Sequence, residues 1–498
     1  MNIAMLLEMV AEGAPDRVIV GAKTGGLTVA QLLQDARRAA AQFRSADVAR
    51  IGFVDLNSEA FPIALFGAAL AGLPFAPVNY RLTDEQFDAI LRRLVPGLVI
   101  VGDDAADRLG TIDGLQVITR GEFIDSVSSE GDDVALPLVD PDDIAVLLFT
   151  SGTTGEPKAA VLRHRHLTSY IITSVECLGA EADEAQLVSV PPHHVAGVSA
   201  VLSSVYSGRR IVYLPGFDPD DWVRTASEEA VTQAMVVPTM LGRVLDRIEE
   251  RGVGLTSLRH LSYGGGRMPL DLIERAMKLL PEVTFVNAYG LTETSSTISV
   301  LTPEDHRDAF ASTDPAIRRR LTSVGRPLPS VELEIRGADG EVLAPGERGE
   351  ICVRGEQVAG EYLGRSVLTD DGWFPTNDAG WFDDDGFLYL EGRLDDVIVR
   401  GAENLSPGEI EETLASHPAV AEAAVVGIPD PEWGEAVAAA VVLVPGQKAS
   451  EDELKQWVRD RLRSTKTPQV VQIRDEMPYN ETGKLLRRVI RVELSVVA

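Results

Sequence analysis

Between residue 27 and about residue 300, segments with helical periodicity alternate with short apolar segments typical of strands. The run Ile144 to Phe149 is one such strand, because it is short, apolar and bounded by polar residues. This alternation favours mostly parallel sheets covered by helices, since parallel neighbours need a crossover connection. Ligands in such sheets bind beyond the carboxyl ends of the strands. We expect helices at 27–44 and 59–71, and further strands at 50–54, 98–101, 185–190, 210–213 and 234–237.

The pattern changes after residue 325, where glycines become frequent and strands become short. Strands at 331–335, 349–354 and 386–390 predict a β-rich subdomain, either an antiparallel sheet or a small barrel. Helices at 406–417 and 450–464, with strands between them, predict a small α+β domain at the end of the chain. The predicted fold is therefore α/β, with an N-terminal domain at 1–394, which includes the β-rich subdomain at 325–394, and a C-terminal domain at 395–498.

Composition limits the classes of function. The formal charge of −30 argues against broad binding of nucleic acids. Eight Lys and Arg against three Asp and Glu at 461–491 form a local basic region that suits phosphate. The uncharged runs 60–80 and 185–208 are interrupted by prolines, so we expect no integral membrane segment. Cys177 and Cys352 are far apart without metal-ligand spacing, and a reducing cytoplasm is the simplest setting.

The nine residues after Phe149 form a loop suited to phosphate. They combine two glycines, four hydroxyls and a lysine, which together favour close approach to an oxyanion. The loop of common nucleotide hydrolases has four residues between its glycines and a hydroxyl after its lysine. Here two residues separate Gly152 from Gly155, and Ala159 follows the lysine. The alternative is a flexible surface loop. The nine residues are Thr150, Ser151, Gly152, Thr153, Thr154, Gly155, Glu156, Pro157 and Lys158.

This loop resembles the signature of the acyl-adenylate-forming enzymes, which include acyl-CoA synthetases, aryl-CoA ligases, luciferases and peptide-synthetase adenylation domains. Further motifs follow in the family's order over most of the chain. They are Tyr289-Gly290-Leu291-Thr292-Glu293-Thr294, Thr376-Asn377-Asp378, Gly392-Arg393-Leu394-Asp395-Asp396 and Asn480-Glu481-Thr482-Gly483-Lys484. The resemblance implies that the loop at 150–158 binds the phosphates of ATP.

The same resemblance assigns roles in the nucleotide site. Tyr289 would stack on adenine, Thr292 would contact phosphate and Glu293 would hold Mg²⁺, a hard cation that prefers carboxylate and phosphate oxygens. Asp378 would bind both ribose hydroxyls with help from Arg393. The family has glycine where this chain has Asn377, and asparagine tolerates positive φ better than most residues. Asn287, Ala288 and Gly290 complete the implied nucleotide site.

The C-terminal domain would supply two further groups. Lys484 would stabilise charge between the carboxylate and the α-phosphate during adenylation. Asp395 would be the hinge about which the domain rotates, removing the lysine and presenting residues 400–404. Gly401 would then line the pantetheine tunnel, where Ala402 replaces a second family glycine.

Two further motifs resemble the walls of the acyl pocket. His193 and His194 follow a Pro-Pro pair, with His194 expected at the pocket mouth. Gly265 and Gly266, in the sequence Tyr263 to Gly266, would let a substrate approach the backbone, and the resemblance also assigns both to the nucleotide site. No Asp lies at 191–208 to hold an ammonium group, so we discount amino acid substrates. Zinc at the two histidines is not expected, because no further ligand set is visible.

These motifs predict an ATP-dependent acid–thiol ligase. It would convert a carboxylic acid to acyl-AMP with release of pyrophosphate, then transfer the acyl group to CoA, using ATP, Mg²⁺ and CoA. Two alternatives stay open: an acyl-AMP ligase that loads a carrier-protein phosphopantetheine, and a non-catalytic nucleotide- or acyl-binding regulator. The sequence leaves the identity of the acid and the formation of a homodimer undecided.

Overall fold

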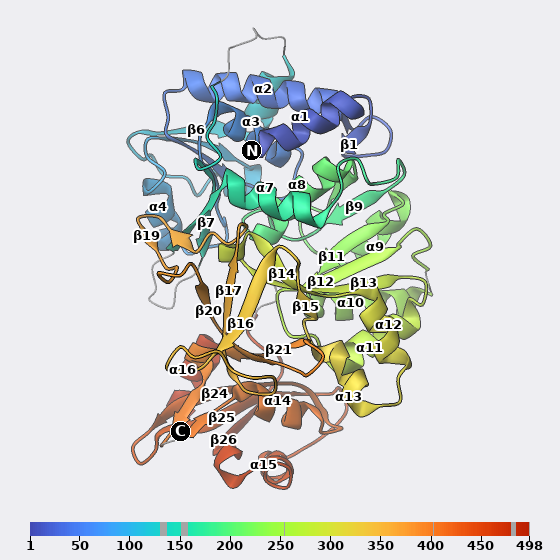
Figure 1. The fold of residues 1–498 in the computed structure, drawn as a ribbon, viewed down its shortest axis with the longest axis vertical. Coiled ribbons are helices and arrows are strands. Elements are labelled where there is room, and N and C mark those ends of the chain that lie inside the picture. Colours follow the sequence, from blue (N-terminus) through green and yellow to red (C-terminus); the bar gives the residue numbers. More distant parts are fainter. Residues whose placement is uncertain (130–136, 151–157, 253, 402, 480–484, 498) are drawn as a thin grey trace.

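The computed structural model describes residues 1–129, 137–150, 158–252, 254–401, 403–479 and 485–497. Its upper part contains two large sheets, and Figure 1 shows the N-terminus there and the C-terminus in the lower part. The first sheet is parallel through β7, β4, β3, β5 and β6, and antiparallel strands extend one edge. Its order is β19 (Arg365–Ser366), β18 (Glu361–Tyr362), β8 (Lys158–Arg163), β7 (Ile144–Thr150), β4 (Phe75–Pro77), β3 (Arg50–Val54), β5 (Gly97–Val101) and β6 (Leu115–Thr119).

The second sheet has a parallel centre with antiparallel strands at both edges. Its order is β15 (Arg326–Pro327), β14 (Ser296–Leu301), β13 (Thr284–Leu291), β12 (His260–Gly264), β11 (Gln233–Val236), β9 (Ala185–Val188), β10 (Arg210–Tyr213), β1 (Val18–Val20) and β2 (Leu27–Thr28). The expected α/β class with mostly parallel sheets is therefore confirmed.

One hydrophobic core joins the two sheets. It takes residues from β3, β4, β5 and β7 of the first sheet, from β1, β9 and β10 of the second, and from the helices between them. Every residue of α3 (Ala60–Ala71) is buried in this part of the molecule, which explains its lack of charge. Its neighbour α2 (Val29–Ser45) begins at a capping box formed by Thr28 and Gln31. The same core includes α1 (Ala4–Gly13) and α8 (Val195–Ser207).

Among the described residues, no helix is both long enough and apolar enough to cross a membrane.

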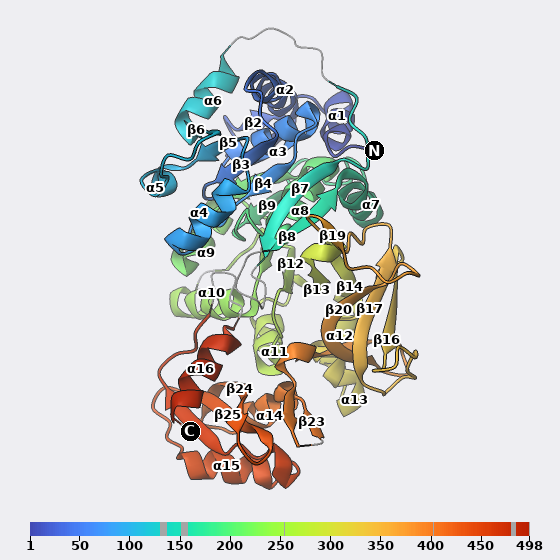
Figure 2. The same cartoon turned by 90° about the vertical axis from the view of Figure 1, so that its left-hand side faces the viewer.

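Further helices cover the outer faces of the sheets. The second sheet packs against α9 (Pro219–Glu228), α10 (Pro238–Arg251), α11 (Leu270–Leu279) and α12 (Pro303–Ala311) in one core. The first sheet packs against α4 (Asp84–Arg92) in another. Figure 2 shows the resulting layers from the side, with α10 and α11 below β12 and the C-terminal elements beneath them.

The β-rich segment forms an antiparallel sheet in the order β16 (Val331–Arg336), β17 (Gly349–Gly355), β20 (Phe374–Phe382) and β21 (Leu388–Arg393). The last strand begins two residues later than the expected Gly386. Gly386 has φ +80°, and the Asp383 carboxylate accepts hydrogen bonds from the N–H groups of Asp385 and Phe387. These contacts build a turn where the sequence predicted the start of the strand.

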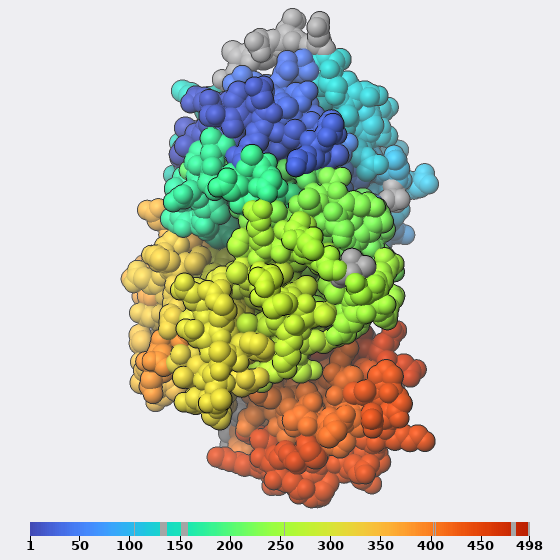
Figure 3. Space-filling model, turned by 90° about the vertical axis from the view of Figure 1, so that its right-hand side faces the viewer, coloured from blue at the N-terminus to red at the C-terminus, as the bar shows by residue number. Residues whose placement is uncertain are grey.

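The strands and helices that follow the turn Leu394–Asp396 lie in the lower part of the molecule, coloured orange to red in Figure 3, and are called the lower lobe. Their sheet has the order β23 (Glu403–Leu405), β22 (Ile398–Arg400), β25 (Gly434–Leu443) and β24 (Val420–Asp430), and β26 (Val470–Arg474) pairs with β25. It packs with α14 (Pro407–Ala415), α15 (Glu451–Arg459) and α16 (Arg487–Val497). The expected helix at 450–464 is thus shorter, although its capping box at Ser450 and Glu453 is present.

Candidate active site

The phosphate loop leaves the first sheet at the carboxyl end of a parallel strand. Strand β7 ends at Thr150, which pairs with Lys158 at the start of antiparallel β8. The Thr150 hydroxyl lies 3.5 Å from the Lys158 carbonyl, and Lys158 is exposed. These two ends therefore hold the loop where the sheet topology predicts a ligand. The predicted phosphate contacts Ser151, Gly152, Thr153, Thr154 and Gly155 lie outside the described residues.

The second sheet contributes the end of β13 and a tight turn after it. A Cβ at Gly290 would lie 1.8 Å from the Ser296 carbonyl oxygen, so only glycine fits between β13 and β14 here. Thr292 and Glu293 lie in the short 3₁₀ turn Thr292–Thr294 that follows. Ser295 and Ser296 have φ of 57° and 118°, uncommon for residues with a side chain. The chain accepts this strain at the turn that presents Thr292 and Glu293.

Tyr289, Asp378 and Arg393 converge from three strands. The Tyr289 hydroxyl donates a 2.6 Å hydrogen bond to Asp378 Oδ2, and Arg393 Nε lies 3.1 Å from Asp378 Oδ1. Asp378 and Arg393 are register partners across β20 and β21. Burial, with Asp378 beside it, raises the pKa of the Tyr289 phenol well above its usual value, so the phenol keeps its proton and donates. The expected proximity of these three side chains is therefore present.

Asn377 adopts a left-handed backbone conformation, which glycine and asparagine enter more readily than other residues. Its φ is 61°, in the left-handed region that asparagine tolerates. Its backbone N–H donates to Glu350 Oε1 at 2.8 Å, and its side-chain amide donates to Asp395 Oδ2 at 2.7 Å. Arg393 holds the preceding carbonyl, that of Thr376, at 2.8 Å. Asparagine therefore fits this left-handed position and makes a side-chain contact that glycine could not make.

Tyr362, which the sequence analysis missed, contacts both Glu293, in the turn after β13 of the second sheet, and Lys158, in β8 of the first. Tyr362 donates a 2.5 Å hydrogen bond to Glu293 Oε1, and Lys158 Nζ lies 5.6 Å from the centre of its ring. The Glu293 carbonyl accepts the N–H groups of Ala359 and Gly360. Tyr362 reaches this place because β18 pairs with β8, opposite Ala160. No local pattern marks that pairing, since the two strands are far apart in the sequence.

The Glu293 carboxylate fits a magnesium site that is completed by a nucleotide. It is a hard oxygen donor, 8% exposed, beside the base of the phosphate loop. The described part of the chain holds no group of three or more His, Cys, Asp or Glu residues that would bind a metal by itself. Mg²⁺ commonly takes one or two carboxylates and fills its other positions with phosphate oxygens and water. Glu293 is therefore the residue that would hold Mg²⁺ together with ATP.

The walls expected for the acyl pocket follow β9 and β12, two strands of the second sheet that are separated by β11. His194 is the residue before α8 and is partly exposed, whereas His193 is buried beside it with ring centres 4.7 Å apart. Burial, with His194 and Arg81 near, holds the pKa of His193 well below its usual value. Gly265 has φ 74°, and Gly266 lies beside Pro238.

Two predicted nucleotide residues in β13 have largely structural surroundings. The side-chain amide of Asn287 donates to the Ser323 carbonyl at 2.9 Å. The Ala288 carbonyl would lie 2.3 Å from a Cβ at Gly264, so the two strands can approach only through glycine. These residues set the spacing of β12 and β13 behind Tyr289.

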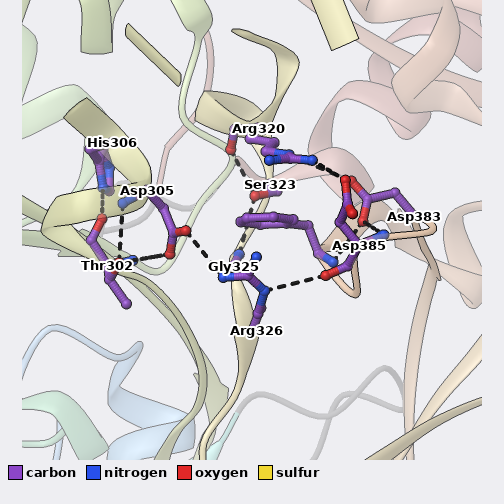
Figure 4. A network of polar contacts seen from close by, with 10 residues as sticks. Thr302, Asp305, His306, Arg320, Ser323, Gly325, Arg326, Asp383 and Asp385 are labelled. Atoms are coloured by element: carbon purple, nitrogen blue, oxygen red, sulfur yellow. Dashed lines mark hydrogen bonds and ion pairs between the residues drawn. The ribbon is translucent and has the colours of Figure 1, made fainter. Parts of the chain in front are cut away.

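A polar network supports the pocket wall and the β20–β21 hairpin. His306 Nδ1–H donates a 2.8 Å hydrogen bond to the Thr302 carbonyl, so His306 Nε2 is the acceptor for the Tyr263 hydroxyl at 2.8 Å. Burial lowers the pKa of His306 to about 4. Arg326 Nη1 lies 3.2 Å from Asp305 Oδ1, and Arg326 Nε donates a 3.3 Å hydrogen bond to the Asp385 carbonyl. Figure 4 shows this network, with Thr302, Asp305 and His306 on one side, Asp383 and Asp385 on the other, and Arg320, Ser323, Gly325 and Arg326 between them.

One predicted residue of the C-terminal lobe, Gly401, is not brought into this cluster. Gly401 is exposed, has φ 62° and donates its N–H to the Trp433 carbonyl at 2.7 Å within its own lobe. Lys484 and Ala402 lie outside the described residues. The residues on either side of 480–484, Tyr479 and Leu485, form an antiparallel bridge.

Comparison with known proteins gives a consistent result. The AMP-binding enzyme family matches residues 7–363, and the AMP-binding enzyme C-terminal domain matches 409–484. A feruloyl-CoA synthase from an Amycolatopsis species is 33% identical over 475 residues, 93% of each chain. The fatty acid–[acyl-carrier-protein] ligase ScoC from Streptomyces coeruleorubidus is 33% identical over 93% of this chain and 91% of its own. ATP-bound MatB from Rhodopseudomonas palustris superimposes with a TM-score of 0.88 at 26% identity, covering 100% of both chains.

The matched regions contain the Tyr289 motif and the segments that bring Lys158 and Tyr362 together. The chain therefore belongs to the AMP-binding enzyme family, the acyl-adenylate-forming enzymes that its motifs resemble.

Proposed function

We propose that the two clusters of side chains are the two ends of one ATP site. Tyr289, Asp378 and Arg393 would bind adenine and ribose, and Lys158 with Glu293 would bind the triphosphate and its Mg²⁺. The single observation that carries this proposal is the hydrogen-bonded contact of Tyr289 with Asp378, from segments 89 residues apart. A carboxylate beside an aromatic residue suits a ribose below a purine, because the carboxylate accepts two hydrogen bonds.

As a member of this family the chain is an ATP-dependent acid–thiol ligase. A carboxylate is a poor acyl donor because its leaving group would be oxide. The carboxylate oxygen attacks the α-phosphorus of ATP, the bond to the β-phosphate breaks, and pyrophosphate leaves. A thiol then attacks the acyl carbon and AMP leaves, giving the thioester. Neither step needs a protein nucleophile, so positioning and charge stabilisation carry the reaction.

Individual residues would divide this work. Lys158 and the loop at 150–158 would neutralise the departing pyrophosphate, and Mg²⁺ held by Glu293 would add charge there. Thr292 would donate to phosphate from the turn after β13. Lys484 would stabilise the charge at the α-phosphorus, and His194 would close the acyl pocket at the start of α8.

We also propose an aromatic carboxylic acid as the substrate. The feruloyl-CoA synthase relative is named for such an acid. In α8, which is otherwise largely buried, Ala196, Ala200 and Ser203 are partly exposed along one face. Their small side chains would leave room for a ring beside His194. Neither observation selects one acid, so we propose a class of substrate and not a single compound.

The acceptor is CoA, and a carrier-protein phosphopantetheine is the second candidate. Ala402 in place of the family glycine and the ScoC relative, named for an acyl carrier protein, favour this second candidate. A non-catalytic regulator is the third reading, and the retained Lys158, Glu293 and Asp378 cluster argues against it.

We further propose that the chain divides at residue 395, with the lower lobe as a mobile lid. The Arg267 guanidinium donates to the Gly408 carbonyl at 3.1 Å and lies 3.0 Å from Glu412, contacts that a rotation would break.

The free thiols of Cys177 and Cys352 support the cytoplasm as the location. Light scattering would decide whether the chain forms a homodimer.

The test is pyrophosphate release across a panel of aryl, alkyl and amino acids. Each acid is supplied alone, with CoA, and with a phosphopantetheinylated carrier protein, and thioester is followed by mass spectrometry. We expect release with aryl acids and thioester with CoA. Thioester formed only on the carrier protein would support the second candidate, and no release with any acid would support the regulator.

A further inference from the structure

We propose that Asn377 is a positioning residue that fastens the hinge of the C-terminal lobe, and thereby favours the arrangement in which ATP reacts. This inference rests on the proposed ATP site and lid. It concerns one contact, the 2.7 Å hydrogen bond from Asn377 Nδ2 to Asp395 Oδ2. The family motif has glycine at this position, which has no side chain to make such a contact.

Asn377 is firmly part of the larger domain. Its N–H is bound to Glu350 of β17, and the hydroxyl of the preceding Thr376 donates to the Ile351 carbonyl at 2.7 Å. The next residue, Asp378, pairs with Tyr289 and Arg393. Because its φ is positive, its side chain leaves the strand direction and reaches the segment after β21. A group held on this many sides provides a fixed anchor.

Two adjacent aspartates of the hinge contact different parts of the molecule, one the larger domain and the other the lower lobe. Asp395 and Asp396 are adjacent in the 3₁₀ turn Leu394–Asp396. Asp395 contacts Asn377 of the larger domain, whereas Asp396 Oδ2 lies 3.6 Å from Arg487 Nε of α16. Arg487 is bound in turn to Glu411 and to the Val425 carbonyl of the lower lobe. Rotation of the lobe must change the backbone at this turn, so it acts directly on the Asn377–Asp395 bond.

The orientation of the lobe indicates which state the bond favours. Residues 1–394 are about four-fifths of the 498-residue chain, so a superposition that misplaced the lower lobe could reach a TM-score of only about 0.8. The TM-score to ATP-bound MatB is 0.88 over both full chains. Both parts are therefore arranged as in a relative that holds ATP. The bond is present in this arrangement, so its loss disfavours adenylation relative to thioester formation.

Asparagine suits both demands of this position. It enters the left-handed region more readily than other residues that have a side chain. It also donates from a neutral amide to a carboxylate, where an aspartate would place a second negative charge. Glycine would satisfy the backbone alone. The substitution Asn377→Gly therefore removes the contact and preserves the turn, which separates the hinge role from folding.

The experiment measures the two half-reactions separately. Adenylation is followed by ATP–pyrophosphate exchange, and thioester formation is followed from synthetic acyl-AMP and CoA. For N377G we expect exchange to fall about threefold to tenfold, the worth of one hydrogen bond. Thioester formation should stay unchanged or rise. N377D should lower exchange further, and the double variant N377D/D395N should restore it, because donor and acceptor are then exchanged.

Asp47→Gly is the matched control, since Asp47 is an exposed residue with φ 52° remote from the hinge. It should leave the ratio of the two rates unchanged. Equal loss of both rates in N377G, no loss in either, or failure of the double variant to recover would overturn the inference while wild-type exchange still supports the ATP site. Absence of exchange in the wild-type chain would overturn the proposed site and the inference together.

Discussion

The Tyr362 phenol lies 2.5 Å from the Glu293 carboxylate while its ring lies 5.6 Å from the Lys158 ammonium nitrogen. One side chain therefore touches the expected metal ligand and covers the base of the phosphate loop. Burial, together with Glu293, raises the pKa of the Tyr362 phenol, so it stays a hydrogen-bond donor at neutral pH. The contact fixes the orientation of Glu293 Oε1. Because the carboxylate group is planar, the direction of its other oxygen is then fixed as well.

Tyr362→Phe should weaken the use of Mg²⁺ by the enzyme. Loss of a hydrogen bond to a charged group costs about 1.5–3 kcal/mol, equivalent to roughly a tenfold to hundredfold change. We expect this change in the Mg²⁺ concentration that gives half-maximal ATP–pyrophosphate exchange. Tyr362→Leu, which also removes the ring beside Lys158, should in addition raise the KM for ATP. An unchanged Mg²⁺ dependence in the phenylalanine variant would show that Glu293 needs no such support.

Asp378→Asn should weaken nucleotide binding with little effect on folding. The substitution keeps the shape but removes the charge beside Arg393, and it replaces one oxygen that would accept a ribose hydroxyl. We expect about a tenfold or greater rise in the Kd for AMP, measured by calorimetry. Asp384→Asn is the control, because Asp384 is an exposed carboxylate of the nearby acidic turn. Equal effects of the two substitutions would show that Asp378 affects AMP binding only through the overall surface charge.

Lys484→Ala should separate the two half-reactions. Removal of the ammonium group takes away charge stabilisation at the α-phosphorus. Loss of one electrostatic contact of this kind typically lowers the rate on the order of a hundredfold or more. Pyrophosphate exchange should fall by that factor, whereas thioester formation from supplied acyl-AMP should persist. Equal loss of both activities would count against a lid that uses different faces for the two steps.

His306 should make the fold sensitive to mild acid. Burial holds the pKa of His306 at about 4, against 6.5 for an exposed histidine. Its contribution is complete above pH 6.5 and is lost as the pH falls toward 4, because the unfolded chain binds the proton first. Between pH 7 and pH 5 this costs about 2 kcal/mol of unfolding free energy.

The measurement compares urea unfolding of the wild type and of His306→Gln at pH 7 and pH 5. Glutamine can still contact Thr302 and Tyr263 but does not titrate. The difference in stability between the two proteins should shrink by about 2 kcal/mol at the lower pH. Other buried groups, such as Asp55, whose pKa burial raises, affect both proteins equally. A constant difference would show that His306 is already neutral in the unfolded chain or charged in the fold.

The sequence was sufficient for those parts of the site that follow from one strand and the residues after it. The strand ending at Thr150 lies where the alternating pattern placed it, and the phosphate loop leaves it at the carboxyl end, as expected for a parallel sheet. Asn377 has a positive φ, which asparagine tolerates better than most residues.

Contacts between distant strands could not be predicted in this way. Tyr362 belongs to the two-residue strand β18, too short for any periodic pattern, and its place depends on pairing with Ala160. The bond between Asn377 and Asp395 depends on the register of β20 against β21. The turn at Gly386 was missed for a local reason, since the Asp383 side chain competes with the strand for its N–H groups.

The opposite attachments of Asp395 and Asp396 bear on how chimeric ligases should be assembled. An enzyme that borrows its last segment from another family member has to be spliced somewhere in this turn. A junction on the peptide bond between the two aspartates would leave each carboxylate with the body it already contacts. If the junction were one residue to either side, one of the two aspartates would come from a different parent than the residue it contacts.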